Sequence, residues 1–136
     1  LSGADLHGAG IGGADLHGAN LSGATGLPDP REWVDACEKH AAGIIAYKQF
    51  GLHYASPAGW RIDVGAEIAD VVNPDRGTEC GSGVNVAHHD WRGFDMSKPI
   101  WRVLIKWRDL ATLIVPFGTD GKARVGAVTL LEVVDA

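Results

Sequence analysis

The chain has 136 residues, of which 46% are hydrophobic and 21% are charged. This composition is typical of a folded globular protein and excludes extended disorder, and the length suits one domain with a small appendage. The formal net charge of -5, without any run of basic residues, argues against a nucleic-acid partner. No apolar segment approaches the roughly 20 residues of a membrane-spanning helix, so no membrane partner is expected.

The cysteine content indicates the compartment. The chain has two cysteines, Cys37 and Cys80, and a secreted domain of this size usually carries more. The N-terminal segment has neither the basic start nor the apolar run of a signal peptide. We therefore expect two reduced thiols in a cytoplasmic protein.

A five-residue repeat runs through residues 1–26. Every fifth residue is aliphatic in a series that consists of Leu1, Leu6, Ile11, Leu16 and Leu21. An alanine lies two residues before each of the last four members of this series. A period of five fits neither an α-helix nor a β-strand. It fits a chain that turns a corner every five residues, with the aliphatic residues and alanines inside and the polar residues outside.

These units resemble pentapeptide-repeat proteins, whose Ala-(Asp/Asn)-Leu-x-x units coil into a right-handed, four-sided β-helix. The resemblance implies one coil with Leu6, Ile11, Leu16 and Leu21 as its core; the alternative is a Gly/Ala-rich linker. A single coil cannot bury its own ends, because repeat arrays generally need about three stacked units. We expect more coils before Leu1, stacking on the second domain, or a protein partner or self-association through the coil end.

A linking segment is predicted over 27–43, with a helix at about 30–41. Asp29 can cap this helix and Pro30 can occupy its first position, where a missing N–H costs nothing. Trp33, Cys37 and neighbouring apolar residues recur at helical spacing and could cover the open end of the coil. Cys37 is expected to be a core residue.

Residues 44–136 are predicted to form a compact α+β domain with five or six largely antiparallel strands. Expected strands cover 44–50, 60–64, 100–107, 113–117 and 123–134, with a helical turn at 108–111 and a hairpin-like connection at 118–122. Trp60, Trp101 and Trp107 alternate with charged residues, which is typical of the buried face of a sheet. The expected fold class is therefore mainly β: a β-helix coil, one linking helix and this domain.

The densest polar stretch lies at 79–91, and three interpretations of it remain open. Cys80 with His88 or His89 could form a nucleophile and base, or these residues with Asp90 could bind a metal. The third interpretation is structural, with a glycine turn, a core cysteine and surface histidines. Neighbouring histidines on a strand point to opposite faces, which disfavours the metal, so no metal or cofactor is predicted.

The C-terminal region resembles the rIIB-like proteins of bacteriophages over about 78–134. The likeness rests on Cys80-x-x-Gly83-Val84, a Val115-Pro116 step, Lys122-x-Arg124 and a closing Val-rich strand. Asn85 stands where that family has a histidine. The resemblance implies a phage or prophage context rather than a reaction.

We expect a non-enzymatic module that binds a protein or a small ligand, because no complete catalytic constellation is present. The alternatives are a phage-type protein that captures a nucleotide signal and an enzyme centred on Cys80. In the first, Trp91 would stack on a base and the other ligand-binding candidates, His88, His89 and Arg92, would hold phosphate.

The repeat interpretation predicts that Leu16→Asp unfolds the coil or dissociates an end-to-end dimer, since an unpaired buried charge costs several kcal/mol. Thermal unfolding and native mass measurement test this. A variant with unchanged stability and unchanged mass in solution would show that the β-helix interpretation is wrong.

Overall fold

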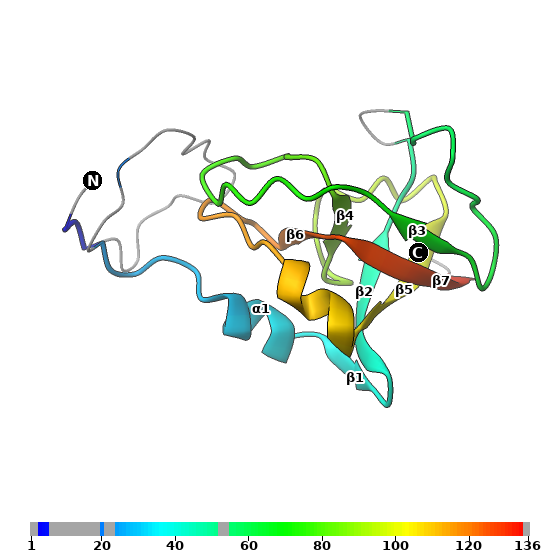
Figure 1. The fold of residues 1–136 in the computed structure, drawn as a ribbon, viewed down its shortest axis with the longest axis horizontal. Coiled ribbons are helices and arrows are strands. Elements are labelled where there is room, and N and C mark those ends of the chain that lie inside the picture. The colour runs from blue at the N-terminus through cyan, green and yellow to red at the C-terminus, as the bar shows by residue number, and fades with distance from the viewer. Residues whose placement is uncertain (1–2, 6–19, 21–23, 52–54, 135–136) are drawn as a thin grey trace.

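The computed structural model describes residues 3–5, 20, 24–51 and 55–134. Within them the fold is mainly β, with few helices and a curled antiparallel sheet, as expected (Figure 1). The sheet order is β3-β7-β5-β2-β4-β6, and β1 also pairs with β2. The strands are β1 (Glu38–His40), β2 (Gly43–Lys48), β3 (Glu67–Ala69), β4 (Val84–Ala87), β5 (Ile100–Lys106), β6 (Lys122–Val125) and β7 (Ala127–Val134).

The helix α1 (Pro30–Asp35) begins as predicted but is shorter than predicted. The Asp29 carboxylate accepts a hydrogen bond from the Arg31 backbone N–H at 2.9 Å, and Pro30 occupies the first position. Residues 38–40 were expected to be helical, but they pair as β1 with the start of β2. Pairing with β2 thus overrides the helical spacing of the apolar residues in this segment. Lys39 Nζ donates to the carbonyl oxygens of Val34 and Asp35 at the end of α1.

The core forms around β2 and β5, which pair in unbroken antiparallel register from Gly43↔Lys106 to Lys48↔Trp101. Apolar residues on the inner faces of the curled sheet are buried together with Trp33 and Cys37, so the expectation that Cys37 belongs to the core is confirmed. Nearly every residue of β2 is buried, which is typical of a central strand covered on both faces.

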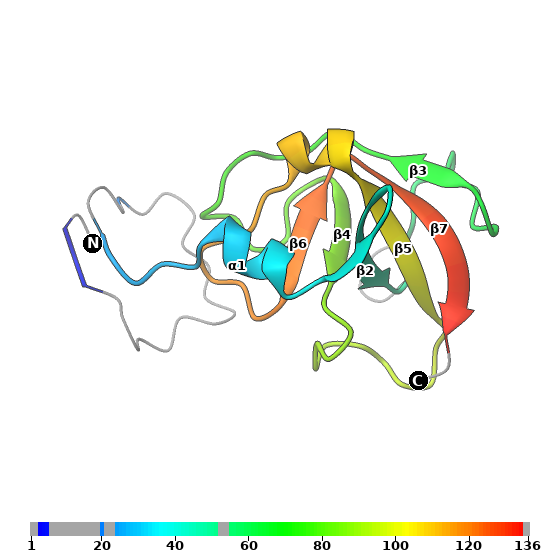
Figure 2. The ribbon, with the colours of Figure 1, turned by 90° about the horizontal axis from the view of Figure 1, so that it is seen from below.

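The C-terminal segment 123–134 contains two strands instead of the one predicted. Gly126 separates β6, which pairs with β4, from β7, which pairs with β3 and β5. A Cβ on Gly126 would lie 3.0 Å from Thr112 Oγ1, so the chain passes closely at this break. Figure 2 shows β7 bending along its length, which lets one continuous segment reach both sides of the curled sheet.

Two predicted strands are absent from the structure. Residues 60–64 alternate in hydrophobicity but pair with no strand, and Val64 is largely exposed. Residues 113–117 form only an isolated bridge, Ile114↔Arg124. The short strands β1, β3 and β4 were not predicted, and the described residues hold seven strands rather than five or six.

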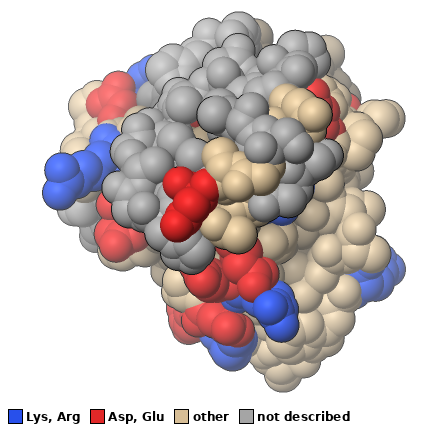
Figure 3. Space-filling model, turned by 90° about the vertical axis from the view of Figure 1, so that its left-hand side faces the viewer, with Lys and Arg blue, Asp and Glu red and all other residues tan. Residues whose placement is uncertain are grey.

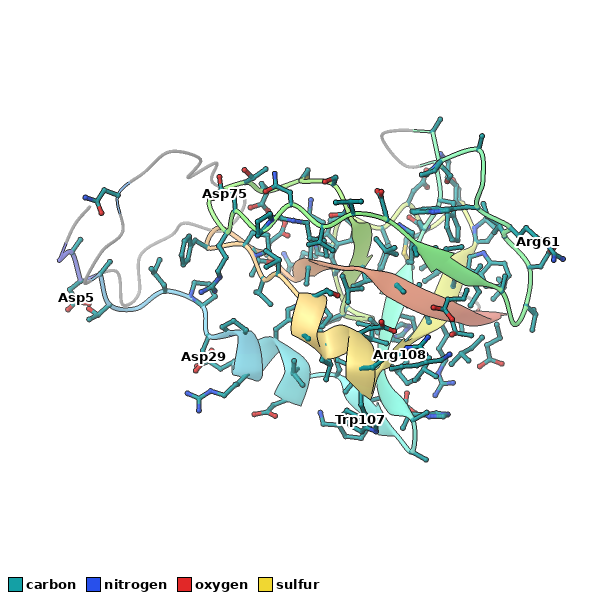
Figure 4. The ribbon with its side chains drawn as sticks, in the orientation of Figure 1. Asp5, Asp29, Arg61, Asp75, Trp107 and Arg108 are labelled. Atoms are coloured by element: carbon teal, nitrogen blue, oxygen red, sulfur yellow. The ribbon has the colours of Figure 1, made fainter. Side chains whose placement is uncertain are left out.

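The three tryptophans predicted for the core have different environments. Trp101 is buried and Trp60 is half-buried against the core, but Trp107 is 51% exposed, so its core assignment is wrong. Trp107 begins the 3-10 helix η1 (Trp107–Thr112), which confirms the helical turn predicted there. Its indole N–H donates to the Ala41 carbonyl beside β1, at the outer edge of the fold (Figure 4).

The N-terminal repeats are described at only a few residues. Asp5 and Thr25 form a parallel β-bridge, in which the Thr25 N–H donates to the Ala4 carbonyl at 2.7 Å. These residues are 20 positions apart, which equals four five-residue units. The predicted coil core of Leu6, Ile11, Leu16 and Leu21 lies outside the described residues.

The close contact between β2 and β5 predicts that Gly43→Ala is destabilising. A Cβ at Gly43 would lie 1.9 Å from the Ile105 carbonyl oxygen, so the two central strands would have to separate. We expect the free energy of unfolding in urea to fall by about 2 kcal/mol or more. Gly59→Ala is the matched control, since its Cβ would meet open space; equal effects of the two changes would contradict the packing.

Candidate functional site

The sheet splits between β2 and β4. These strands are paired at a single position, Tyr47↔Ala87. Beyond this pair the segments 48–51, 80–83 and 85–86 line a pocket of about 360 Å³, together with residues from the 55–60 loop and the 91–94 turn. The pocket therefore occupies a place where a continuous sheet would have further ladder hydrogen bonds.

Lys48 is the buried charge of this pocket. It follows Ile44 and Ala46 on the inner face of β2, and its residue is only 8% exposed. The ammonium Nζ donates to the Asn85 carbonyl oxygen at 2.9 Å and thereby bridges the split. Burial lowers the pKa of Lys48 to about 8, and among the described residues no carboxylate forms an ion pair with it.

Two neighbouring aromatic rings lie beside this ammonium. Lys48 Nζ lies 5.2 Å from the ring centre of Phe50 and 5.4 Å from that of Trp60, within the range of cation–π attraction. Phe50 packs edge-on against both Trp60 and Trp101. The indole N–H of Trp60 donates to the Ala69 carbonyl at 2.9 Å, which fixes that ring in the wall of the pocket.

The opposite wall is held by a second buried cation, Arg124 of β6. Its guanidinium is fully buried and donates to the carbonyl oxygens of Asn73, Asp75 and Thr78, so that it organises the loop before β4. A Cβ on Gly81 would lie 3.0 Å from the Arg124 guanidinium, so a glycine is needed for the close approach.

The side chain of Asn85 completes this wall. Its amide donates to the carbonyls of Gly81 and Gly83, while its backbone carbonyl accepts from Lys48. Asn85 thus connects the two sides of the pocket.

Cys80 and Lys122 lie at the rim. Lys122 Nζ donates to the Cys80 sulfur at 3.1 Å and lies 5.3 Å from the Trp91 ring centre. The Trp91 indole N–H donates to Asp120 at 2.9 Å, and its ring packs edge-on against Phe94. Cys80 is exposed, whereas Cys37 is buried.

The candidates from the sequence are not all in one place. Cys80 and Trp91 line the pocket, but His88 stacks on Trp33 and lies 2.9 Å from the Trp33 carbonyl through Nε2. His89 and Arg92 are exposed, with the His89 ring 4.7 Å from Tyr47. In the described part of the chain, no hydrogen bond joins Cys80 to either histidine.

Sequence reasoning missed Lys48 and Asn85. The signal for Lys48 was available, because a charged residue continues the inward alternation of Ile44 and Ala46. Asn85 gave no comparable signal, since its role depends on where two distant strands diverge.

The described residues provide neither a metal site nor a membrane-spanning helix. No group of three or more His, Cys, Asp or Glu side chains among the described residues is arranged to hold a metal. No helix in the described residues is long and apolar enough to cross a membrane. On the face at the N-terminal end, the described acidic and basic side chains are interspersed (Figure 3).

Because Cys80 is exposed and Cys37 is buried, we predict that iodoacetamide alkylates Cys80 selectively. Burial raises the pKa of Cys37 to about 11, so this thiol stays protonated and shielded near neutral pH. Peptide mass mapping should find Cys80 modified in the native protein and Cys37 modified only after unfolding.

Cys80→Ser is the control and should abolish the fast modification. Equal, slow modification of both cysteines would contradict this arrangement and would remove the basis for Cys80 as a nucleophile.

The N-terminal part of the chain is similar to a known family. Residues 1–25 match the family model of pentapeptide repeats. No curated protein and no solved structure matches the chain significantly, and the likeness of residues 78–134 to phage rIIB-like proteins gains no support. Residues 1–25 are therefore pentapeptide repeats, which are generally protein-interaction modules.

Proposed function

We propose that the chain is a non-enzymatic binding module with two parts. The pentapeptide repeats contact a protein, and the pocket between β2 and β4 holds a small organic ligand. The observation that carries the proposal is Lys48, a buried ammonium without a carboxylate partner among the described residues, in the wall of that pocket.

The donor groups of Lys48 define the polar part of the ligand. An ammonium has three N–H donors, and the described residues accept one of them through the Asn85 carbonyl. A ligand oxygen, such as that of a carboxylate, sulfonate or carbonyl, can accept another. Inside the pocket this hydrogen bond is charge-assisted and shielded from water, which makes it stronger than one at the surface.

The pocket walls define the apolar part. Phe50 and Trp60 on one side, with Trp91 and Phe94 near the other, present flat apolar surfaces. The volume of about 360 Å³ lies at the lower end of the range for small-molecule sites. The ligand we propose is a flat apolar molecule with one oxygen acceptor that faces Lys48.

The repeats supply the protein contact in this proposal. The parallel bridge between Asp5 and Thr25 has the spacing of one four-unit coil, which supports a compact repeat unit next to α1. The exposed ends of such a coil offer backbone N–H and C=O groups to a second chain.

A nucleotide is the second candidate ligand. Trp91 lines the pocket with Lys122 beside its ring, an arrangement suited to a base and a phosphate. Cyclic nucleotides therefore belong among the ligands to be tested for this pocket.

The test uses anilinonaphthalene sulfonate, a fluorescent aromatic anion, as the probe. We expect saturable binding to the intact chain and an affinity that falls roughly tenfold or more in Lys48→Met. Since the ammonium is present below its pKa of about 8, the affinity should hold near pH 6.5 and fall as pH rises through about 8.

Lys106→Met is the matched control. It removes the same charge from a lysine that pairs with Glu67 outside the pocket, and it should bind the probe as the parent chain does. Lys48→Met should fold normally, because methionine fills a similar volume without a buried charge. Equal, pH-independent probe binding by all three proteins would overturn the proposal.

A further inference from the structure

We propose that Lys48 captures aldehydes in this pocket by forming an imine, so that the ligand class is carbonyl compounds with a flat apolar body. This inference rests on the proposed function and deepens it. It assigns a covalent role to the amine that anchors the ligand.

The geometry brings the amine and a carbonyl carbon together. Lys48 lines the pocket. Its Nζ is positioned by the hydrogen bond to the Asn85 carbonyl and by the rings of Phe50 and Trp60. An aldehyde whose oxygen accepts a hydrogen bond from Nζ has its carbonyl carbon one bond away from that contact. Fixed proximity of this kind favours addition over the same reaction in solution.

The protonation state also favours reaction. Only a neutral amine can attack a carbonyl, and burial lowers the pKa of Lys48 to about 8. Near pH 7 roughly one Lys48 in ten is then neutral, against roughly one in a few thousand for an ordinary exposed lysine. Lys48 is therefore both charged often enough to hold an acceptor and neutral often enough to react.

The reaction balances without an oxidant or reductant. The nitrogen lone pair forms a C–N bond while the carbonyl oxygen takes up a proton, which gives a carbinolamine. The carbinolamine then loses its oxygen as water, and the C=N bond forms. Over the two steps the nitrogen gives up two protons, and both leave in that water molecule. The products are one imine and one water molecule, and hydrolysis reverses the step.

The described lysines provide internal comparisons. Lys122 also lines the pocket but lies at the rim beside the exposed Cys80, while Lys106 pairs with Glu67 at the surface. Lys39 donates to three carbonyls near the end of α1. Among these lysines, Lys48 is the one that combines desolvation with two aromatic neighbours.

The experiment is reductive trapping on the full chain with benzaldehyde and cyanoborohydride near pH 7. Intact mass and peptide mapping should find one benzyl group, carried by Lys48 and formed at least roughly tenfold faster than on any other lysine. Lys48→Met should lose the fast modification and Lys106→Met should keep it. Prior unfolding in urea should abolish the selectivity.

Trapping at Lys122 or at surface lysines as fast as at Lys48 would overturn this inference. Its failure can be told apart from failure of the proposed function. If Lys48 is not trapped but the sulfonate probe still depends on Lys48, the pocket binds ligands without capturing carbonyls. If Lys48 is trapped but the probe does not bind, the capture stands and the broader acceptor class is wrong.

Discussion

The interruption of pairing between β2 and β4 is the constraint on which the rest of this site depends. After Tyr47↔Ala87 the strands separate, and the Asn85 carbonyl, which would accept a backbone N–H in a continuous ladder, accepts the Lys48 ammonium instead. A buried carbonyl must have a partner. The Lys48 side chain therefore supplies the hydrogen bond that joins the two strands, although their backbones stay apart. The space between the separated backbones is the pocket.

Two buried cations contrast the structural role of Arg124 with the binding role that we propose for Lys48. Arg124 donates to three loop carbonyls and thereby fixes the wall that contains Cys80 and Gly81. Lys48 donates to one carbonyl and otherwise lies beside two aromatic rings, and its burial costs on the order of 3 kcal/mol while it is charged. This penalty applies below about pH 8 and is relieved as pH rises toward the ordinary lysine pKa near 10.5. A strained group of this kind in a pocket is typical of a functional site.

Local patterns predicted the parts of the fold that depend on local chemistry. The Asp29 cap, the buried Trp101 face of β5 and the turn at η1 follow from spacing and residue type. The end of α1, the strand β4 and the unpaired segment 60–64 could not be predicted, because each is decided by which distant strand is available to pair. The same reason explains the site: Cys80 and Trp91 were found from polar density, whereas Lys48 gained its role only from the divergence of β2 and β4.

We propose that Lys48 is a desolvated ammonium whose charged form is stabilised when a ligand acceptor binds in the pocket. A nuclear magnetic resonance titration that follows the Lys48 side-chain carbon next to Nζ, with and without anilinonaphthalene sulfonate, tests this directly. We expect a titration midpoint near the pKa of about 8 in the free chain and a higher midpoint with the probe, since a bound acceptor stabilises the charged form. A midpoint at the ordinary lysine value, unchanged by the probe, would contradict it.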